Sequence, residues 1–150
     1  MRVVIQRVKA SKVVVDAVDI ASIDLGMVIL LGIETDDNTT DVDWLVAKIS
    51  GLRIFEDAEG KMNLDINDVG GSFLVISQFT LHASTKKGNR PSYIRAARPE
   101  QAVPLYEYFI NQLANISQRP VKTGIFGADM KVHLINDGPV TITIDTKNRE

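Results

Sequence analysis

Cysteine is absent from the 150 residues, and histidine occurs only at His82 and His133. Without cysteine the chain has no disulfide, no thiolate nucleophile and no cysteine-rich zinc site. A metal site would have to depend on carboxylates, and no group of acidic residues has the spacing of paired ligands. We therefore expect neither a metal nor a cofactor.

A long apolar run is also missing. The longest, at residues 27–31, is followed by Gly32 and is far shorter than the roughly 20 residues that cross a bilayer. The first seven residues begin an alternating strand and lack the apolar core and small-residue cleavage site of a signal peptide. These absences predict a cytoplasmic protein that contacts no membrane.

The composition that is present is average for a globular protein. Hydrophobic residues make up 45% and charged residues 24%, which argues against a disordered or fibrous chain. A length of 150 residues is typical of one compact domain, so we predict a single domain over residues 1–150. Because the formal net charge is −2, any binding of nucleic acid must come from a local basic patch.

The hydrophobic pattern predicts both strands and helices. One helix is expected to be capped by Thr39 or Thr40 and to stop at Gly51, and a second is expected after Pro99. Strands are expected at residues 3–8, 12–20, 23–33, 52–55, 73–79, 130–135 and 140–145. The first three should form an antiparallel meander with a bulge at Gly26. The sum is an α+β fold, with a mainly antiparallel, barrel-like curved β-sheet and two helices packed on it.

Polar side chains end the apolar strand at residues 73–79. Ser77 and Thr80 carry hydroxyls that a rigid strand can present at a cleft, and Gln78 can form hydrogen bonds beside them. A hydroxyl nucleophile needs a base, but neither histidine has the spacing of a catalytic triad. His82 is a candidate only because it lies beside the motif, and a Ser or Thr at a strand end more often forms a turn.

Two further segments carry candidate functional residues. Gly138-Pro139 lies between the last two predicted strands, where a cis proline would aim carbonyl oxygens in an unusual direction, and where the simpler alternative is a hairpin turn. Basic residues gather around the loop at residues 84–92, as a phosphate-binding edge requires, although a solvated charged loop explains them equally well. They are Lys86, Lys87, Arg90, Arg95 and Arg98.

Three motifs, taken in order, resemble those of the D-aminoacyl-tRNA deacylase family. They are Ser-Gln-Phe-Thr-Leu at residues 77–81, Lys-Gly-Asn-Arg-Pro-Ser at 87–92 and Asn-Asp-Gly-Pro-Val-Thr at 136–141. Segments at residues 52–57, 60–63 and 123–128 are also similar to that family, so the resemblance covers nearly the whole chain. It implies hydrolysis of the ester between a D-amino acid and the terminal adenosine of tRNA, a step of chiral proofreading in translation. The expected nucleic-acid partner is then tRNA, and no binding of DNA is expected.

The family resemblance also implies a homodimer with its sites between the subunits. The motif from Ser77 to Thr80 in one subunit would meet the Gly138-Pro139 turn of the other. With the proline in cis, this turn would stand where an L side chain must lie, so that L-amino acids are excluded and achiral glycine is accepted. Arg7 matches a position that holds the turn in place. The residues that would bind tRNA are Lys86, Lys87 and Arg90.

Two mechanisms are open for the chemical step. In one, the 2′-hydroxyl beside the ester assists the attack of water, while backbone N–H groups near Gln78 and Phe79 stabilise the oxyanion. In the other, Thr80 is a covalent nucleophile. The first is favoured because the sequence pairs no base with Thr80.

The chain departs from the family pattern in two places, and two rival functions stay open. His82 stands where many members have tyrosine, and the hairpin at residues 16–19 lacks the usual glycine. One rival is a non-catalytic tRNA-binding module in which the basic loop grips the RNA. The other is a related deacylase with a trans Gly138-Pro139 bond and relaxed chirality.

Overall fold

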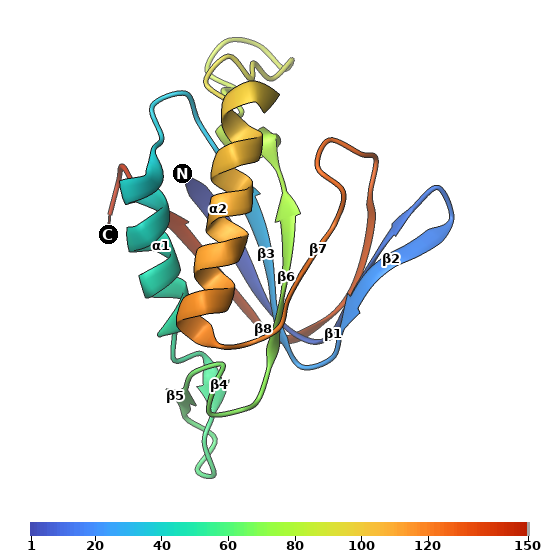
Figure 1. The fold of residues 1–150 in the computed structure, drawn as a ribbon, viewed down its shortest axis with the longest axis vertical. Helices are drawn as coiled ribbons and strands as arrows, with labels where there is room; N and C mark the ends of the chain where they lie inside the picture. Colours follow the sequence, from blue (N-terminus) through green and yellow to red (C-terminus); the bar gives the residue numbers. More distant parts are fainter. Residues whose placement is uncertain (150) are drawn as a thin grey trace.

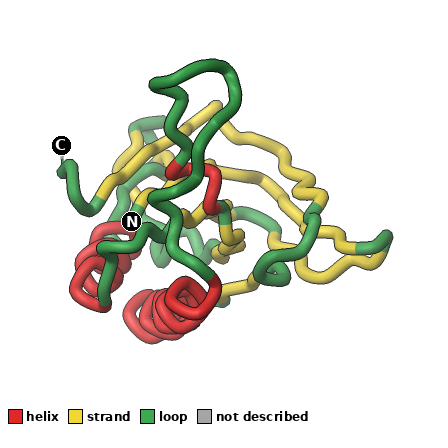
Figure 2. Tube along the Cα trace, turned by 90° about the horizontal axis from the view of Figure 1, so that it is seen from above, coloured by secondary structure: helices red, strands yellow, loops and turns green. Residues whose placement is uncertain are grey.

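A computed structural model describes residues 1–149 (Figure 1). Its centre is a curved six-stranded sheet in the order β2-β1-β3-β6-β7, with β8 paired to β1, and two short strands form a second sheet. Two helices, α1 (Thr39–Ser50) and α2 (Pro99–Ser117), lie side by side on one face of the large sheet (Figure 2). The strands are β1 (Arg2–Val15), β2 (Val18–Ile23), β3 (Gly26–Gly32), β4 (Phe55–Glu56), β5 (Met62–Leu64), β6 (Ser72–Ser77), β7 (Val121–Thr123) and β8 (Lys131–Asp145).

The predicted α+β fold with a curved sheet and two helices is confirmed, although the sheet is mixed. β1 pairs antiparallel with β2, β3 and β8, whereas β3 pairs parallel with β6 and β6 pairs parallel with β7. Parallel neighbours need a long crossover connection, which a helix usually supplies. Here α1 lies between β3 and β6, and α2 lies between β6 and β7, so the two predicted helices account for the parallel pairs.

The first third of the chain is divided differently from the prediction. The strand expected at residues 3–8 and the first part of the one expected at 12–20 form the single long strand β1, whereas residues 18–20 belong to β2. The meander order is wrong because β1 lies between β2 and β3. The hairpin into β2 turns at Asp16 and Ala17, which adopt positive φ angles of 48° and 63°. This is the backbone geometry that tight hairpin turns need, and the chain adopts it without glycine.

The cap residue of helix α1 precedes both predicted cap residues, Thr39 and Thr40. The cap is Asn38, whose side-chain oxygen accepts a hydrogen bond from the backbone N–H of Thr40 over 2.9 Å. Asp41 completes the exchange by accepting from the N–H of Asn38 over 3.1 Å, which satisfies donors that the first turn leaves unpaired. The helix ends at Gly51, as predicted.

The main core fills the space between the helices and the sheet, and it fixes the strand that leads to the predicted site. Phe109 of α2 and Phe73 of β6 are fully buried in it. The Tyr106 hydroxyl donates to the carbonyl of Val75 on β6 over 2.9 Å. Burial raises the pKa of Tyr106 to about 12, so this hydroxyl keeps its proton and the hydrogen bond.

Two other predicted strands change at their ends. Residues 52–54 are not strand, since β4 covers only Phe55–Glu56. The strand expected at 73–79 ends at Ser77, and a short 3₁₀ helix, η1 (Phe79–His82), follows Gln78. Within residues 1–149, neither helix combines the length and the apolar character that a bilayer span requires.

The Gly138-Pro139 segment is not a hairpin turn between two strands. Both flanking segments belong to β8 and pair with the same neighbour, β1. Gln6 pairs with Thr141 and Val8 pairs with Asn136, so the four residues 137–140 stand opposite Arg7 alone. We call these four residues the Gly-Pro bulge. A bulge of this size bends the strand and turns its extra residues out of the ladder.

Candidate active site

The Ser77–Thr80 motif leaves the sheet at the carboxyl end of β6. The backbone N–H of Gln78 donates to the carbonyl of Leu31 over 2.8 Å, which extends the parallel ladder by one residue beyond Ser77. The chain then turns into η1, where the N–H of Leu81 donates to the Gln78 carbonyl over 3.2 Å. The motif is therefore held by strand bonds at its start and by a 3₁₀ turn at its end.

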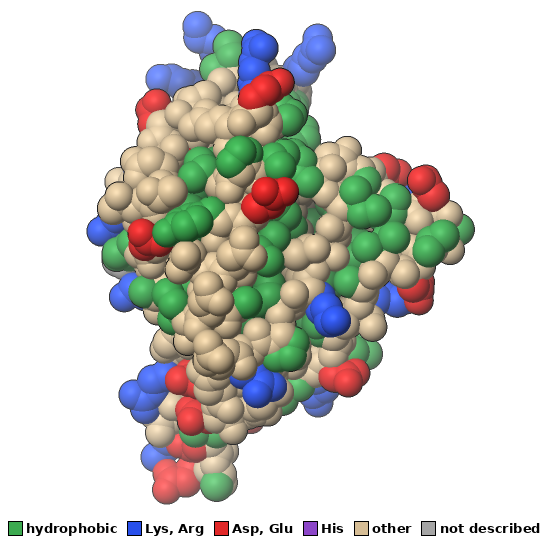
Figure 3. Space-filling view, in the orientation of Figure 1, with side chains coloured by type: hydrophobic (Ala, Val, Ile, Leu, Met, Phe, Trp, Pro, Cys, Tyr) green, Lys and Arg blue, Asp and Glu red, His purple; other side chains and the backbone are tan. Residues whose placement is uncertain are grey.

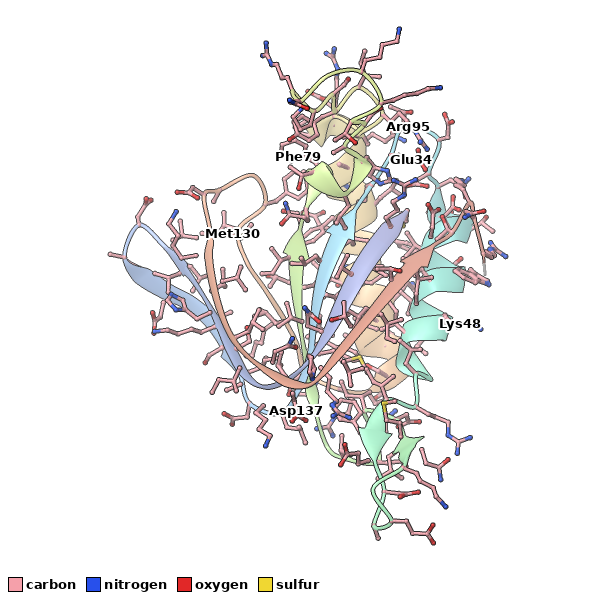
Figure 4. All side chains as sticks on the ribbon, turned by 180° about the vertical axis from the view of Figure 1, so that it is seen from behind. Glu34, Lys48, Phe79, Arg95, Met130 and Asp137 are labelled. Carbon is pink, nitrogen blue, oxygen red and sulfur yellow. The ribbon has the colours of Figure 1, made fainter. Side chains whose placement is uncertain are left out.

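A cleft of about 280 Å³ opens beside this turn. One wall carries Ser77, Gln78 and Phe79, and the facing segment from Phe126 to Met130 forms another. Phe79 and Met130 lie on the same side of the molecule (Figure 4). The other lining residues are Leu31, Ile33, Ile76, Ala97, Ala102 and Val132, which make the floor largely apolar.

Among residues 1–149, no base lies beside the Thr80 hydroxyl. Its Oγ1 accepts a hydrogen bond from Nε2 of Gln78 over 2.6 Å. The side chain of His82, the nearest histidine in the sequence, is fully buried, and neither ring nitrogen has a hydrogen-bond partner among the described residues. Burial lowers the pKa of His82, although the Gly32 backbone and the Glu34 carboxylate act in the opposite direction. His82 therefore fills the interior behind η1 as a neutral ring and does not face the cleft.

The Gly-Pro bulge is held from beneath by Arg7, which is only 3% exposed. Arg7 Nε donates to the Asp137 carbonyl and lies 3.2 Å from the Asp137 carboxylate, while Nη1 donates to the Ile54 carbonyl over 2.6 Å. The Gly138-Pro139 peptide bond is cis, and Gly138 has a φ of 117°. Arg7 is therefore in direct contact with the bulge.

One chain does not bring the bulge and the cleft together. Arg7 pairs with Met27 on β3, whereas Ser77 pairs with Leu31 on the same strand. At roughly 3.3 Å per residue, these positions are about 13 Å apart along the sheet. Figure 4 shows Phe79 in the upper part of the molecule and Asp137 in the lower part.

The basic loop lies at the end of the molecule where α2 begins (Figure 1). Ser84 and Ser92 bridge its base, and Lys86, Lys87 and Arg90 are exposed beyond them. Figure 3 shows Lys and Arg side chains gathered at that end. The loop is joined to the motif by Tyr93, whose ring meets that of Phe79 edge-on at 5.1 Å between centroids.

Some residues at the site were not predicted from sequence chemistry. Met130 and Phe126 line the cleft, yet apolar side chains give no catalytic signal. Phe126 lies in the segment at residues 123–128 that resembles the family, whereas Met130 lies outside it. Glu34 is buried next to His82 and forms an ion pair with Arg95. Its only signal was an acidic residue directly after a nearly continuous apolar strand.

A larger hollow of about 540 Å³ lies elsewhere, between α1 and the end of β8. Trp44, Lys48 and Arg149 are among its lining residues, and it contains none of the residues predicted for chemistry. Among residues 1–149, no three His, Asp or Glu side chains come together in a way that could hold a metal ion. Of these two cavities, the smaller cleft is the better candidate because it is lined by the motif residues Ser77, Gln78 and Phe79.

Curated relatives resemble this chain over its full length. A protein of Bacteroides fragilis named D-aminoacyl-tRNA deacylase is 61% identical over 150 residues, and one of Flavobacterium psychrophilum with the same name is 58% identical. In both comparisons 100% of each chain is covered.

Two solved structures and one family model are also similar to this chain. A structure titled c-Myc DNA Unwinding Element Binding Protein has a TM-score of 0.91 and 40% identity, covering 97% of this chain and 98% of its own. A probable eukaryotic D-amino acid tRNA deacylase has a TM-score of 0.78 at 16% identity, covering 95% and 97%, which shows the fold alone. The family model described as D-Tyr-tRNA(Tyr) deacylase matches residues 4–145. The chain therefore belongs to the D-Tyr-tRNA(Tyr) deacylase family.

Proposed function

We propose that this protein is a D-aminoacyl-tRNA deacylase, which hydrolyses the ester between a D-amino acid and the terminal adenosine of tRNA. The observation that carries the proposal is the cleft at the end of β6, where the Ser77–Thr80 motif is rigidly held in a chain of this family. The named relatives, about 60% identical over their whole length, support the same substrate. The reaction belongs to translation, so we place the protein in the cytoplasm.

The size of the cleft indicates which part of the substrate it can hold. A volume of about 280 Å³ lies just below the usual range for ligand pockets and suits one amino acid. The adenosine must then lie outside, over the rim. Phe79 is 56% exposed at that rim and offers an aromatic face to a base.

The oxyanion donors differ from the sequence expectation in one respect. The N–H of Gln78 is already donated to Leu31, so it cannot also bind the substrate. The N–H groups of Phe79 and Thr80 begin η1, and neither has a backbone acceptor among the described residues. We assign the oxyanion to these two donors, while the 2′-hydroxyl of the adenosine assists the attacking water.

Thr80→Ala is expected to keep activity within about tenfold of the wild type, because Thr80 has no base and removing a nucleophile costs several orders of magnitude. A tRNA that ends in 2′-deoxyadenosine should instead be hydrolysed far more slowly by both proteins. Single-turnover rates on D-tyrosyl-tRNA measure both effects. A loss of more than a thousandfold in Thr80→Ala, with full activity on the deoxy substrate, would make Thr80 the nucleophile.

We propose that two copies complete each site. The Gly-Pro bulge is about 13 Å from the motif along one chain, so the two can meet only if a second copy supplies the bulge. Two exposed apolar residues precede the bulge on β8, where Leu134 is 39% and Ile135 is 61% exposed, and their burial against a partner would stabilise a dimer. In the dimer, Gly138 and Pro139 would stand where an L side chain must lie.

The test compares D-tyrosyl-tRNA, L-tyrosyl-tRNA and glycyl-tRNA as substrates. We expect the wild type to hydrolyse the D and glycyl esters and to leave the L ester intact. Gly138→Ala should lose activity on the D ester by about a hundredfold, because a Cβ there lies 2.9 Å from Val140 Cγ2 and 3.1 Å from the Arg7 guanidinium, at a φ that L residues rarely adopt.

Two outcomes of the same assay would contradict the proposal. If the wild type hydrolyses no ester but still binds tRNA, the protein is a non-catalytic binding module. If D and L esters disappear at equal rates, it is a deacylase that does not select by chirality. Sedimentation of the wild type and Gly138→Ala shows whether both remain dimers, so that a loss of activity is not a loss of assembly.

A further inference from the structure

Arg95 differs from the basic residues of the loop because a buried partner holds it. Its Nε donates to Oε2 of Glu34 over 3.1 Å, and Nη2 bonds to the same oxygen. The Glu34 side chain is 4% exposed, whereas that of Arg95 is 54% exposed. Figure 4 shows the two side chains together, below the loop. One edge of the guanidinium is therefore anchored in the interior while much of the side chain remains open to solvent.

The backbone around Arg95 is also fixed. The N–H of Thr35 donates to the Arg95 carbonyl over 3.1 Å, and the N–H of Ala97 donates to the Ile33 carbonyl over 2.9 Å. Between them, Glu34 and Ala96 form an isolated β-bridge. The ion pair with Glu34 and these backbone hydrogen bonds together restrict the position of the Arg95 guanidinium. Lys86 and Arg90, in contrast, make no ion pair within the described part of the chain.

Arg95 stands close to the rim of the candidate site. Tyr93, two residues earlier, packs edge-on against Phe79 of the motif at 5.1 Å between ring centroids. Ala97, two residues later, lines the cleft itself. The segment that carries Arg95 therefore contacts the site on both sides of this residue.

We propose that Arg95, oriented by Glu34, binds the phosphate that links the terminal adenosine of tRNA to the preceding nucleotide. This inference rests on the proposed function, since the adenosine must lie at the rim. A guanidinium presents a planar fork of donors that matches phosphate, and Nη1 of Arg95 donates to no acceptor in residues 1–149. Because the side chain is already ordered, binding loses less entropy than it would with a mobile lysine.

A substitution of Glu34 separates two explanations, because they predict opposite changes in the affinity for tRNA. If tRNA is attracted only by diffuse positive charge, Glu34→Gln removes a negative charge and strengthens binding. If Glu34 works by orienting Arg95, the same substitution weakens binding although the net charge becomes more favourable. Glutamine preserves the size of the side chain and an acceptor oxygen, so the fold is disturbed as little as possible.

The experiment measures kcat/KM on two substrates that share the same ester. One is D-tyrosyl-tRNA, and the other is the D-tyrosyl ester of adenosine, which carries no phosphate. Arg95→Ala should lose about tenfold or more on the tRNA, mainly through KM, and should be unchanged on the adenosine ester. Arg95→Lys should lie between the two, because it keeps the charge without the fork.

The matched controls are Glu59→Gln and Lys61→Ala. These residues form an exposed ion pair, each 73% exposed, near the turn between β4 and β5 at the far end of the molecule (Figure 1). They change the net charge by the same amounts as Glu34→Gln and Arg95→Ala, and we expect a change of less than twofold on either substrate.

A tRNA with a neutral methylphosphonate at the last linkage allows a thermodynamic cycle that combines the protein change, Arg95→Ala, with removal of the phosphate charge. The wild type should lose the same factor on it as Arg95→Ala loses on ordinary tRNA, and Arg95→Ala should lose nothing further. Tighter binding by Glu34→Gln, or an equal loss on both substrates in Arg95→Ala, would overturn the proposal, since Arg95 would then act by diffuse charge or only support Tyr93. If the wild type hydrolyses neither ester, the proposed function fails, and binding of uncharged tRNA by the same variants still decides the phosphate contact.

Discussion

Gly26→Ala is expected to destabilise the protein by about 3 kcal/mol or more, the largest effect on stability among single substitutions that add one methyl group. A Cβ at this position would lie 1.8 Å from the carbonyl oxygen of Ser72 and 2.8 Å from its carbonyl carbon. Both atoms belong to the backbone of β6, so no side chain can move aside. Because Gly26 pairs with Val8 as well, β3 cannot shift without disturbing two neighbours.

Urea unfolding at equilibrium measures this effect from the midpoint and the slope. Gly51→Ala is the matched control, since a Cβ there meets nothing closer than the Ala47 carbonyl at 3.8 Å and the φ of −99° suits any L residue. We expect the control to stay within about 0.5 kcal/mol of the wild type. Equal stabilities for the two variants would show that the sheet tolerates a wider spacing between β3 and β6 than its register implies.

Arg7→Ala is expected to destabilise the protein by about 3 kcal/mol and to abolish selective hydrolysis of the D ester. The substitution removes a buried guanidinium that donates to the carbonyls of Ile54 and Asp137. The Asp137 carboxylate is 25% exposed and can regain water, which keeps the cost near the lower end of the range for a broken buried pair. The Gly-Pro bulge then loses its support, so Gly138 and Pro139 no longer hold their place.

Two further variants separate the support of the bulge from simple loss of charge. Arg7→Lys keeps the charge, but a single ammonium cannot serve both carbonyls with the geometry of a guanidinium, so we expect a partial loss in both stability and selectivity. Lys12→Ala removes an exposed ion pair with Asp19 from the same strand and should cost less than about 0.5 kcal/mol. Urea unfolding and the D-tyrosyl-tRNA assay would contradict this account if Arg7→Ala behaved like Lys12→Ala.

The elements that the sequence predicted well are those with a strong local signal. Helix α1 repeats apolar residues on one face and stops at Gly51, and α2 begins at Pro99, whose fixed φ suits a first turn. The Ser77–Thr80 motif was also placed correctly at the end of an apolar strand. In each case neighbouring residues alone contain the information, because helix periodicity and caps act over a few residues.

The predictions that failed depended on pairing between distant segments. β1 was divided in two because its pattern changes where its partner changes from β3 to β2, although β8 pairs along both halves. For Gly138-Pro139 the sequence left two interpretations open, a cis proline at the substrate pocket and a hairpin turn. The hairpin interpretation was wrong because both flanking segments pair with the same distant strand, β1. Gly26 was expected to be a bulge, but it is regularly paired, and its lack of a side chain serves the close approach of Ser72.

By itself the sequence determined the class of fold, the two helices, the motif residues and the family resemblance, because these follow from composition, local periodicity and motif order. Only the tertiary structure decided that the Gln78 N–H is already bonded, that His82 is buried away from the cleft, and that Glu34 holds Arg95. It also decided that the bulge and the cleft lie about 13 Å apart along the sheet of one chain. Burial, register and hydrogen-bond partners depend on residues far apart in the sequence, and no local pattern contains them.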